Sequence, residues 1–142
     1  MQEENAIEAW LMWYSCVEFE PYDVEFLVKG RMSAGTCDTV GLLTYPQKNI
    51  YNRVYYLDWK SSMFVDRPAH GTQIATYKVM DGRYPDAGIA VLYLDKDLKN
   101  PYKPYNFVDY TPYFKRYRKQ FNFWRAAFYN VRPKLAKQAG RK

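Results

Sequence analysis

Ile89 to Leu94 is an uninterrupted apolar run of strand length, bounded by Gly88 and Asp95. This run is the feature that most constrains the fold, because it predicts a strand buried in a hydrophobic core. A chain of 142 residues is long enough to bury such a core in one domain, and it is too short for two domains of ordinary size.

The middle of the chain contains further strand patterns. Residues 23–28 alternate weakly, residues 39–45 form a short apolar run ended by a proline, and residues 50–59 are rich in Tyr, Val and Ile. Residues 72–80 also alternate and are followed by the turn dipeptide Asp81-Gly82. Together these patterns predict an α+β protein with a small antiparallel sheet of three to five strands.

The first segment predicts a helix that is apolar on nearly all sides. Asn5 is a candidate N-cap, with Glu8 at the spacing of a capping box, and an apolar stretch follows. Pro21 is expected to end this helix near Phe19. A helix with so little polar surface is usually buried on several sides or covered by another chain.

The last third of the chain differs in character. Three prolines within residues 100–112 predict an extended strap rich in aromatic residues. Thr111 and Pro112 then suit the start of a long helix, with an aromatic stripe at heptad spacing and a basic remainder. We therefore divide the chain into a small α+β domain over 1–100 and a strap, helix and basic tail over 101–142, packed on the same domain or on a partner.

Charge is segregated along the chain. Residues 1–28 hold seven acidic and no basic residues, whereas residues 96–142 hold thirteen basic and two acidic residues, so the net charge of +6 conceals two oppositely charged ends. The two ends can pair within the fold, or they can meet different partners.

No familiar catalytic, cofactor or metal motif is present. The chain lacks a Gly-x-Ser-x-Gly elbow and a phosphate-binding glycine loop. The single histidine, His70, lies in a stretch typical of a loop, and Cys16 and Cys37 have no Cys-x-x-Cys partners. Two reduced thiols are favoured for this pair, with one disulfide left open. We predict no catalytic residues, no cofactor, no metal and no small-molecule substrate.

The function predicted from these patterns is that of a non-catalytic accessory subunit in a large assembly. Aromatic residues make up 19% of the chain, more than a monomer of this size is expected to hide. The residues expected to contact other protein subunits are Trp10, Trp13, Tyr102, Tyr105, Phe107, Tyr110, Phe114, Tyr117, Phe121, Trp124 and Phe128. Those expected to bind an anionic surface, either lipid headgroups or RNA, are Lys115, Arg116, Arg118, Lys119, Arg125, Lys134, Lys137, Arg141 and Lys142.

A peripheral position on the mitochondrial inner membrane, in a respiratory complex or ATP synthase, fits a basic aromatic chain without a spanning segment. Otherwise a cytoplasmic location is expected. The alternatives are an RNA-binding protein of ribosomal type that uses the basic C-terminal helix, a virion structural protein and, last, a small enzyme.

Overall fold

A computed structural model describes residues 2–30 and 34–122. Its central feature is a sheet of five strands in the order β1-β2-β3-β4-β5. In chain order the elements are α1 (Gln2–Tyr14), β1 (Glu18–Lys29), β2 (Ala34–Tyr45), a 3₁₀ turn (Pro46–Lys48), β3 (Ile50–Lys60), α2 (Arg67–Asp81), β4 (Gly88–Leu94), β5 (Tyr105–Asp109) and a second 3₁₀ turn (Thr111–Tyr113). Residues 114–122 are helical.

The sheet is mixed, so the predicted antiparallel sheet is wrong. Strands β1, β2 and β3 form an antiparallel meander, and β5 is antiparallel to β4. Strands β3 and β4, however, are parallel neighbours connected by α2. Parallel neighbours need such a crossover connection, which is usually a helix.

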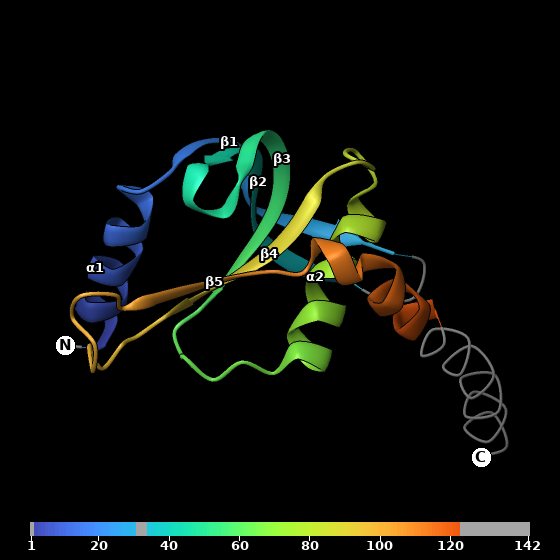
Figure 1. The fold of residues 1–142 in the computed structure, drawn as a ribbon. Coiled ribbons are helices and arrows are strands. Elements are labelled where there is room, and N and C mark those ends of the chain that lie inside the picture. Colours follow the sequence, from blue (N-terminus) through green and yellow to red (C-terminus); the bar gives the residue numbers. More distant parts are fainter. Residues whose placement is uncertain (1, 31–33, 123–142) are drawn as a thin grey trace, which may run out of the picture.

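The helices lie on both sides of this sheet (Figure 1). One core cluster joins α1 to the sheet and contains Ala9 and Trp13 together with Leu57 and Leu92. The other contains Ile74 and Ala75 of α2, Tyr117 of the 114–122 helix and residues from the opposite sheet face. Every residue of β4 is buried, because this strand is covered on both faces.

Helix α2 replaces the strand predicted over residues 72–80. The Asp66 side chain caps the helix by accepting a hydrogen bond from the Ala69 amide at 3.1 Å. Gly82 ends it in the left-handed conformation, with φ of 70°. The buried residues Ile74, Ala75 and Lys78 recur at helical spacing. The strand prediction was wrong because it considered the alternation of polar and apolar residues and not this helical spacing.

The terminal predictions also change. Asn5 lies inside α1 and donates to the Lys96 carbonyl at 2.9 Å instead of capping the helix, which ends at Tyr14 rather than near Phe19. The predicted strap over 100–112 includes strand β5. The predicted long basic helix lies outside the described residues beyond position 122. In the described part of the chain, no helix has the length and apolarity needed to cross a membrane.

A bulge near the β2–β3 turn sets the register of these two strands. Tyr45 pairs with Ile50, but Leu43 pairs with Arg53, so β3 carries one extra residue between these pairs. Asn52 adopts a φ of 48° there, and its amide donates to Thr44 Oγ1 at 2.9 Å. Beyond this bulge, each residue of β3 pairs with β2 one position away from where a hairpin without the bulge would place it.

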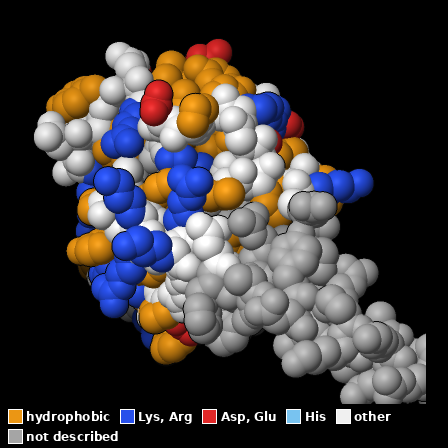
Figure 2. Space-filling view, turned by 90° about the vertical axis from the view of Figure 1, so that its right-hand side faces the viewer, with side chains coloured by type: hydrophobic (Ala, Val, Ile, Leu, Met, Phe, Trp, Pro, Cys, Tyr) orange, Lys and Arg blue, Asp and Glu red, His pale blue; other side chains and the backbone are white. Residues whose placement is uncertain are grey.

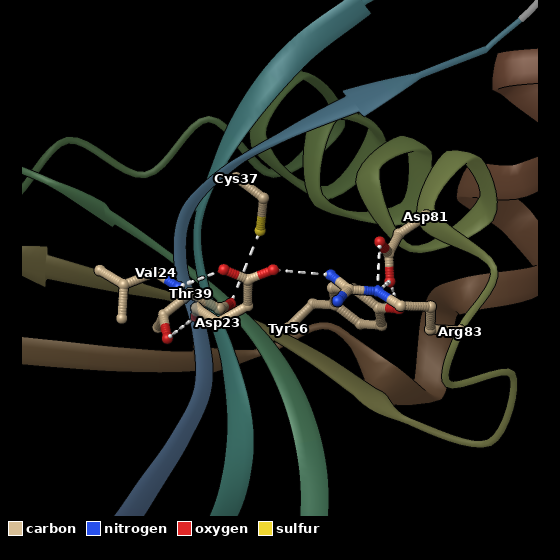
Figure 3. A network of polar contacts seen from close by, with 7 residues as sticks. All are labelled: Asp23, Val24, Cys37, Thr39, Tyr56, Asp81 and Arg83. Carbon is tan, nitrogen blue, oxygen red and sulfur yellow. Dashed lines mark hydrogen bonds and ion pairs between the residues drawn. The ribbon is translucent and has the colours of Figure 1, made fainter.

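A polar network ties the outer strand β1 to the end of α2 (Figure 3). Arg83 contacts Asp23 of β1 at 3.2 Å and Asp81 of α2 at 2.9 Å, and the Tyr56 hydroxyl donates to Asp81. Burial, followed by the hydrogen bond to Asp81, raises the pKa of Tyr56. The network therefore fixes α2 against the meander.

Gly71 allows the 114–122 helix to approach α2 closely. A Cβ at this position would lie 2.5 Å from the Tyr117 ring. We expect Gly71→Ala to lower the free energy of unfolding by about 1–2 kcal/mol, because overpacking exceeds the gain in helix propensity. Urea denaturation measures this change. In a Tyr117→Leu background the same substitution should be neutral or stabilising, and equal losses in both backgrounds would contradict the packing argument.

Candidate active site

Two aspartates face each other across strands β2 and β3. The pairs Thr39–Leu57 and Val40–Tyr56 place Asp38 opposite Asp58 in the antiparallel register. The two carboxyl groups are joined by a hydrogen bond. Since Tyr56 belongs to the core on the α2 side of the sheet, period-two alternation places Asp58 on that side as well.

Asp38 is held in a fixed orientation in a partly buried environment. Its Oδ2 accepts a hydrogen bond from the Trp59 amide at 2.8 Å. Burial, followed by the hydrogen bond to Asp58, raises the pKa of Asp38 to about 7. Two neighbouring carboxylates repel each other when both are ionised. Asp38 therefore keeps its proton up to about neutral pH when no cation is bound.

Lys60 completes the group from the same face of β3, two residues after Asp58. Its Nζ lies 3.0 Å from Asp58 Oδ2 and donates to Gln73 Oε1 at 2.6 Å. The Lys60 side chain is 27% exposed and that of Asp58 is 7% exposed, so a solvent molecule or substrate meets the lysine first.

Helix α2 supports this group from above the sheet. The Gln73 amide donates to the Tyr77 hydroxyl at 2.9 Å, and the Tyr77 ring packs closely on Gly35 of β2. One turn earlier on α2, His70 Nδ1 lies 2.8 Å from the Tyr93 hydroxyl of β4. Burial, followed by the charge on Lys60, lowers the pKa of His70. His70 is therefore on a helix beside the site rather than in a loop.

The site lies at the carboxyl end of β3, beside its parallel neighbour β4. Open sheets with a helical crossover commonly bind ligands at this end of their strands, where side chains from several elements converge. Here β2 supplies Asp38, β3 supplies Asp58 and Lys60, and α2 supplies Gln73. A pair of strands and the crossover helix thus position all four groups.

Two facing carboxylates suit a hard divalent cation. The described residues contain no cluster of three or more His, Cys, Asp or Glu side chains that could hold a metal. Mg²⁺, however, is usually bound by only one or two carboxylates, with waters and substrate phosphates completing its octahedron. The chemistry of Asp38 and Asp58 fits this binding mode.

The aromatic residues predicted to contact partners are mostly inside the protein. Trp13, Phe107, Tyr110 and Tyr117 are buried, and Trp10, Tyr105, Phe114 and Phe121 are partly buried. Trp10, Trp13, Tyr105 and Phe107 gather around α1, whereas Tyr110, Phe114 and Tyr117 belong to the α2 side. Tyr102 is 92% exposed. Trp124 and Phe128 lie outside the described residues.

The predicted anion-binding residues that the structure describes lie on the surface. These are Lys115, Arg116, Arg118 and Lys119, all exposed on the 114–122 helix. Figure 2 shows that, on the coloured part of the right-hand face of the view in Figure 1, Lys and Arg side chains outnumber Asp and Glu side chains. Arg125, Lys134, Lys137, Arg141 and Lys142 lie outside the described residues.

Both cysteines are free in the structure. Cys37 is buried, and burial, followed by the charge on Asp58, raises the pKa of its thiol. A thiol with a raised pKa is a poor nucleophile at neutral pH, so Cys37 adds no reactive group to the site.

Sequence reasoning missed Asp38, Asp58, Lys60 and Gln73. The available signal was an acidic residue directly before one predicted strand and an Asp-x-Lys triplet at the end of the next. Two carboxylates on adjoining strands are candidates for one shared site. The strand wrongly predicted over residues 72–80 hid the contribution of Gln73.

Replacing Asp38 tests the shared proton. Without divalent cations, the folded protein keeps this proton up to pH about 7, whereas an unfolded aspartate loses it near its ordinary pKa of 3.8. The free energy of unfolding should therefore fall as pH rises from about 4 to 7, and then level off. We expect the difference between wild type and Asp38→Asn to follow this profile, with the variant more stable at pH 8. Denaturation in EDTA measures it, and a pH-independent difference would contradict the assignment.

No protein-family model matches the chain, and no curated protein matches it as a relative. The functional argument therefore depends on the site itself.

Proposed function

We propose that this protein is a divalent-cation-dependent phosphodiesterase that cleaves nucleic acid. The observation that carries the proposal is the placement of Asp38 opposite Asp58, with Lys60 on the same face of the sheet and bonded to Asp58. This arrangement places two carboxyl groups and one ammonium group together at the carboxyl end of β3, where the Lys60 side chain is 27% exposed.

The charges of the group favour a phosphodiester as the substrate. A cation held by two ionised carboxylates is neutralised by them, which leaves the Lys60 ammonium as the net charge of the site. A singly charged phosphodiester complements that charge. The basic face in Figure 2 and the net charge of +6 extend the complementarity to a polyanion.

The reaction proposed is hydrolysis. A water oxygen forms a bond to phosphorus, one ester oxygen leaves as an alcohol, and the proton released from water ends on that alcohol through solvent. When bound, the cation would lower the pKa of the attacking water and screen phosphate charge. Asp38 and Asp58 would hold it, Lys60 would donate to a phosphate oxygen, and Gln73 would position Lys60.

A cleavage assay tests this function. End-labelled single- and double-stranded DNA and RNA are incubated with the full chain in Mg²⁺, Mn²⁺, Ca²⁺ or EDTA, and products are resolved on denaturing gels. We expect cleavage of at least one substrate with Mg²⁺ or Mn²⁺ and none with EDTA. Absence of cleavage for every substrate and metal would overturn the proposal.

The predicted role in a larger assembly is a second candidate, and the apolar outer surface of α1 favours it. Ile7 is 59% exposed and Leu11 is 54% exposed, and they lie one turn apart on α1, so their side chains form one apolar patch. A pull-down from the source cell followed by sizing tests this role. The ribosomal and virion alternatives, the mitochondrial location and binding to lipid headgroups stay predictions from the sequence.

A further inference from the structure

A cavity of about 490 Å³ opens between the start of α2 and the 114–122 helix. Its walls are Arg67 and Pro68 from α2 and Tyr113, Arg116, Tyr117 and Gln120 from the later segment. It therefore combines two guanidinium groups, an amide and aromatic rings, and it shares no residue with the carboxylate pair.

The cavity is built by close packing between two elements. The Tyr117 ring lies against Gly71, is 7% exposed, and makes edge-on contacts with Tyr110 and Tyr113. This contact fixes the 114–122 helix on α2 and brings Arg116 to the same cavity as Arg67. The site is therefore a defined pocket rather than a scatter of surface cations.

The two arginines are available for an external anion. In residues 2–30 and 34–122, neither guanidinium has a carboxylate within ion-pair distance. The nearest acidic residue in sequence, Asp66, uses its carboxylate to cap α2 at Ala69. Two arginines that line one pocket and have no carboxylate partner among the described residues match the planar, multidentate recognition of a phosphate group.

Helix α2 connects this pocket to the carboxylate pair. Arg67, His70 and Gln73 follow one another at successive turns of the helix, and Gln73 accepts the hydrogen bond from Lys60. Arg67 and Gln73 are about 9 Å apart along the axis at 1.5 Å per residue. Arg67 and Lys60 would therefore serve different phosphates along one strand.

We propose that the pocket binds a backbone phosphate of the nucleic-acid strand whose neighbouring phosphodiester lies at Asp38 and Asp58; this inference rests on the proposed function. Tyr113, which is 47% exposed at the pocket wall, offers a ring on which the adjoining base can stack. Phosphate contacts of this kind position a strand without reading its sequence.

The test measures binding separately from cleavage. All variants are made in the Asp58→Asn background, and binding to a labelled single-stranded oligonucleotide is followed by fluorescence anisotropy over a range of salt concentrations. The pocket variant is Arg67→Gln/Arg116→Gln. The matched control is Lys48→Gln/Lys103→Gln, which removes the same charge from exposed residues that do not line the pocket and lie outside the 114–122 helix. Thermal melts confirm that each variant is folded.

We expect the pocket variant to bind at least about tenfold more weakly and the slope of log affinity against log salt to fall by about 0.7, the value for one phosphate contact on a single strand. The control should change affinity less than about threefold. Equal losses in the two variants, or no loss in the pocket variant, would overturn the proposal.

Oligonucleotides with and without a terminal phosphate distinguish an internal phosphate from an end phosphate as the ligand. If the pocket variant loses affinity for both oligonucleotides, the ligand is an internal phosphate. If it loses affinity only for the oligonucleotide with a terminal phosphate, the ligand is the phosphate at the strand end. A protein that binds through the pocket but never cleaves with Mg²⁺ or Mn²⁺ would overturn the proposed hydrolysis while supporting the phosphate pocket.

Discussion

Asp58→Asn is expected to reduce phosphodiester cleavage by about 10³-fold or more, since losing a ligand oxygen removes several kcal/mol of transition-state stabilisation. The amide has the shape of the carboxylate but supplies no negative charge for a divalent cation. The Asp58 side chain is 7% exposed and faces Asp38, the one other carboxylate described at the site. Initial rates on the best-cleaved oligonucleotide measure the loss.

Lys60→Ala is expected to reduce cleavage by about as much as Asp58→Asn, while Mg²⁺ still binds. The reason is that the Lys60 ammonium is proposed to bind a phosphate oxygen and not the cation. Asp86→Asn is the matched control for the acidic variant and Lys48→Ala for the basic one. Both residues are exposed, and they precede β4 and β3, whereas the site lies at the carboxyl end of β3. Site variants purified in parallel that keep full activity would show that cleavage comes from a contaminant or another site.

Trp13→Ala is expected to lower the free energy of unfolding by about 3–5 kcal/mol, the range for removing a large buried aromatic side chain. Trp13 is 1% exposed, stacks on Phe107 at 6.2 Å between ring centroids, and meets Tyr45 edge-on at 6.3 Å. These contacts help to attach α1 to its side of the sheet. Urea denaturation followed by tryptophan fluorescence and circular dichroism measures the change.

Leu11→Ala on the same helix is the control, because its side chain is 54% exposed and surface substitutions usually change stability by less than about 0.5 kcal/mol. The pair also separates two roles for α1. A core role predicts a large loss for Trp13→Ala alone, in the isolated protein. A Trp13→Ala variant of unchanged stability that no longer joins its assembly would instead favour the partner contact predicted from the sequence.

Local sequence patterns located several strands but not their arrangement. The apolar run from Ile89 forms β4, and the aromatic-rich segment from Ile50 forms β3. Both could be predicted because strands buried in a sheet are rich in apolar and aromatic residues. The composition of these strands does not show that they pair in parallel. Predicting that pairing requires recognising that α2 connects them. Gly71, Thr72 and Thr76 are weak helix formers, and the Asp66 cap and tertiary packing outweighed them.

The candidate site was harder to predict from the sequence than the strands. Asp38 and Asp58 are twenty positions apart, and their meeting depends on strand register. A hairpin paired symmetrically about the Pro46–Lys48 turn continues the Tyr45–Ile50 pair and would place Leu57 opposite Asp38. Only the extra residue at the bulge brings Asp58 there, and neither Tyr51 nor Asn52 indicates a bulge by type alone.

The bulge near the β2–β3 turn determines on which face of the sheet Asp58 lies. Segments at hairpin tips usually accept insertions and deletions freely. Here, removing one residue between Ile50 and Arg53 would remove the bulge and keep Leu43 opposite Arg53, so Asp58 would still face Asp38. Pairing β3 without the bulge at its present length would instead place Leu57 opposite Asp38 and turn Asp58 and Lys60 toward α1. The local geometry of the bulge, and not the number of residues in the turn, thus determines which side of the sheet carries the two acids, at a point far along the strand.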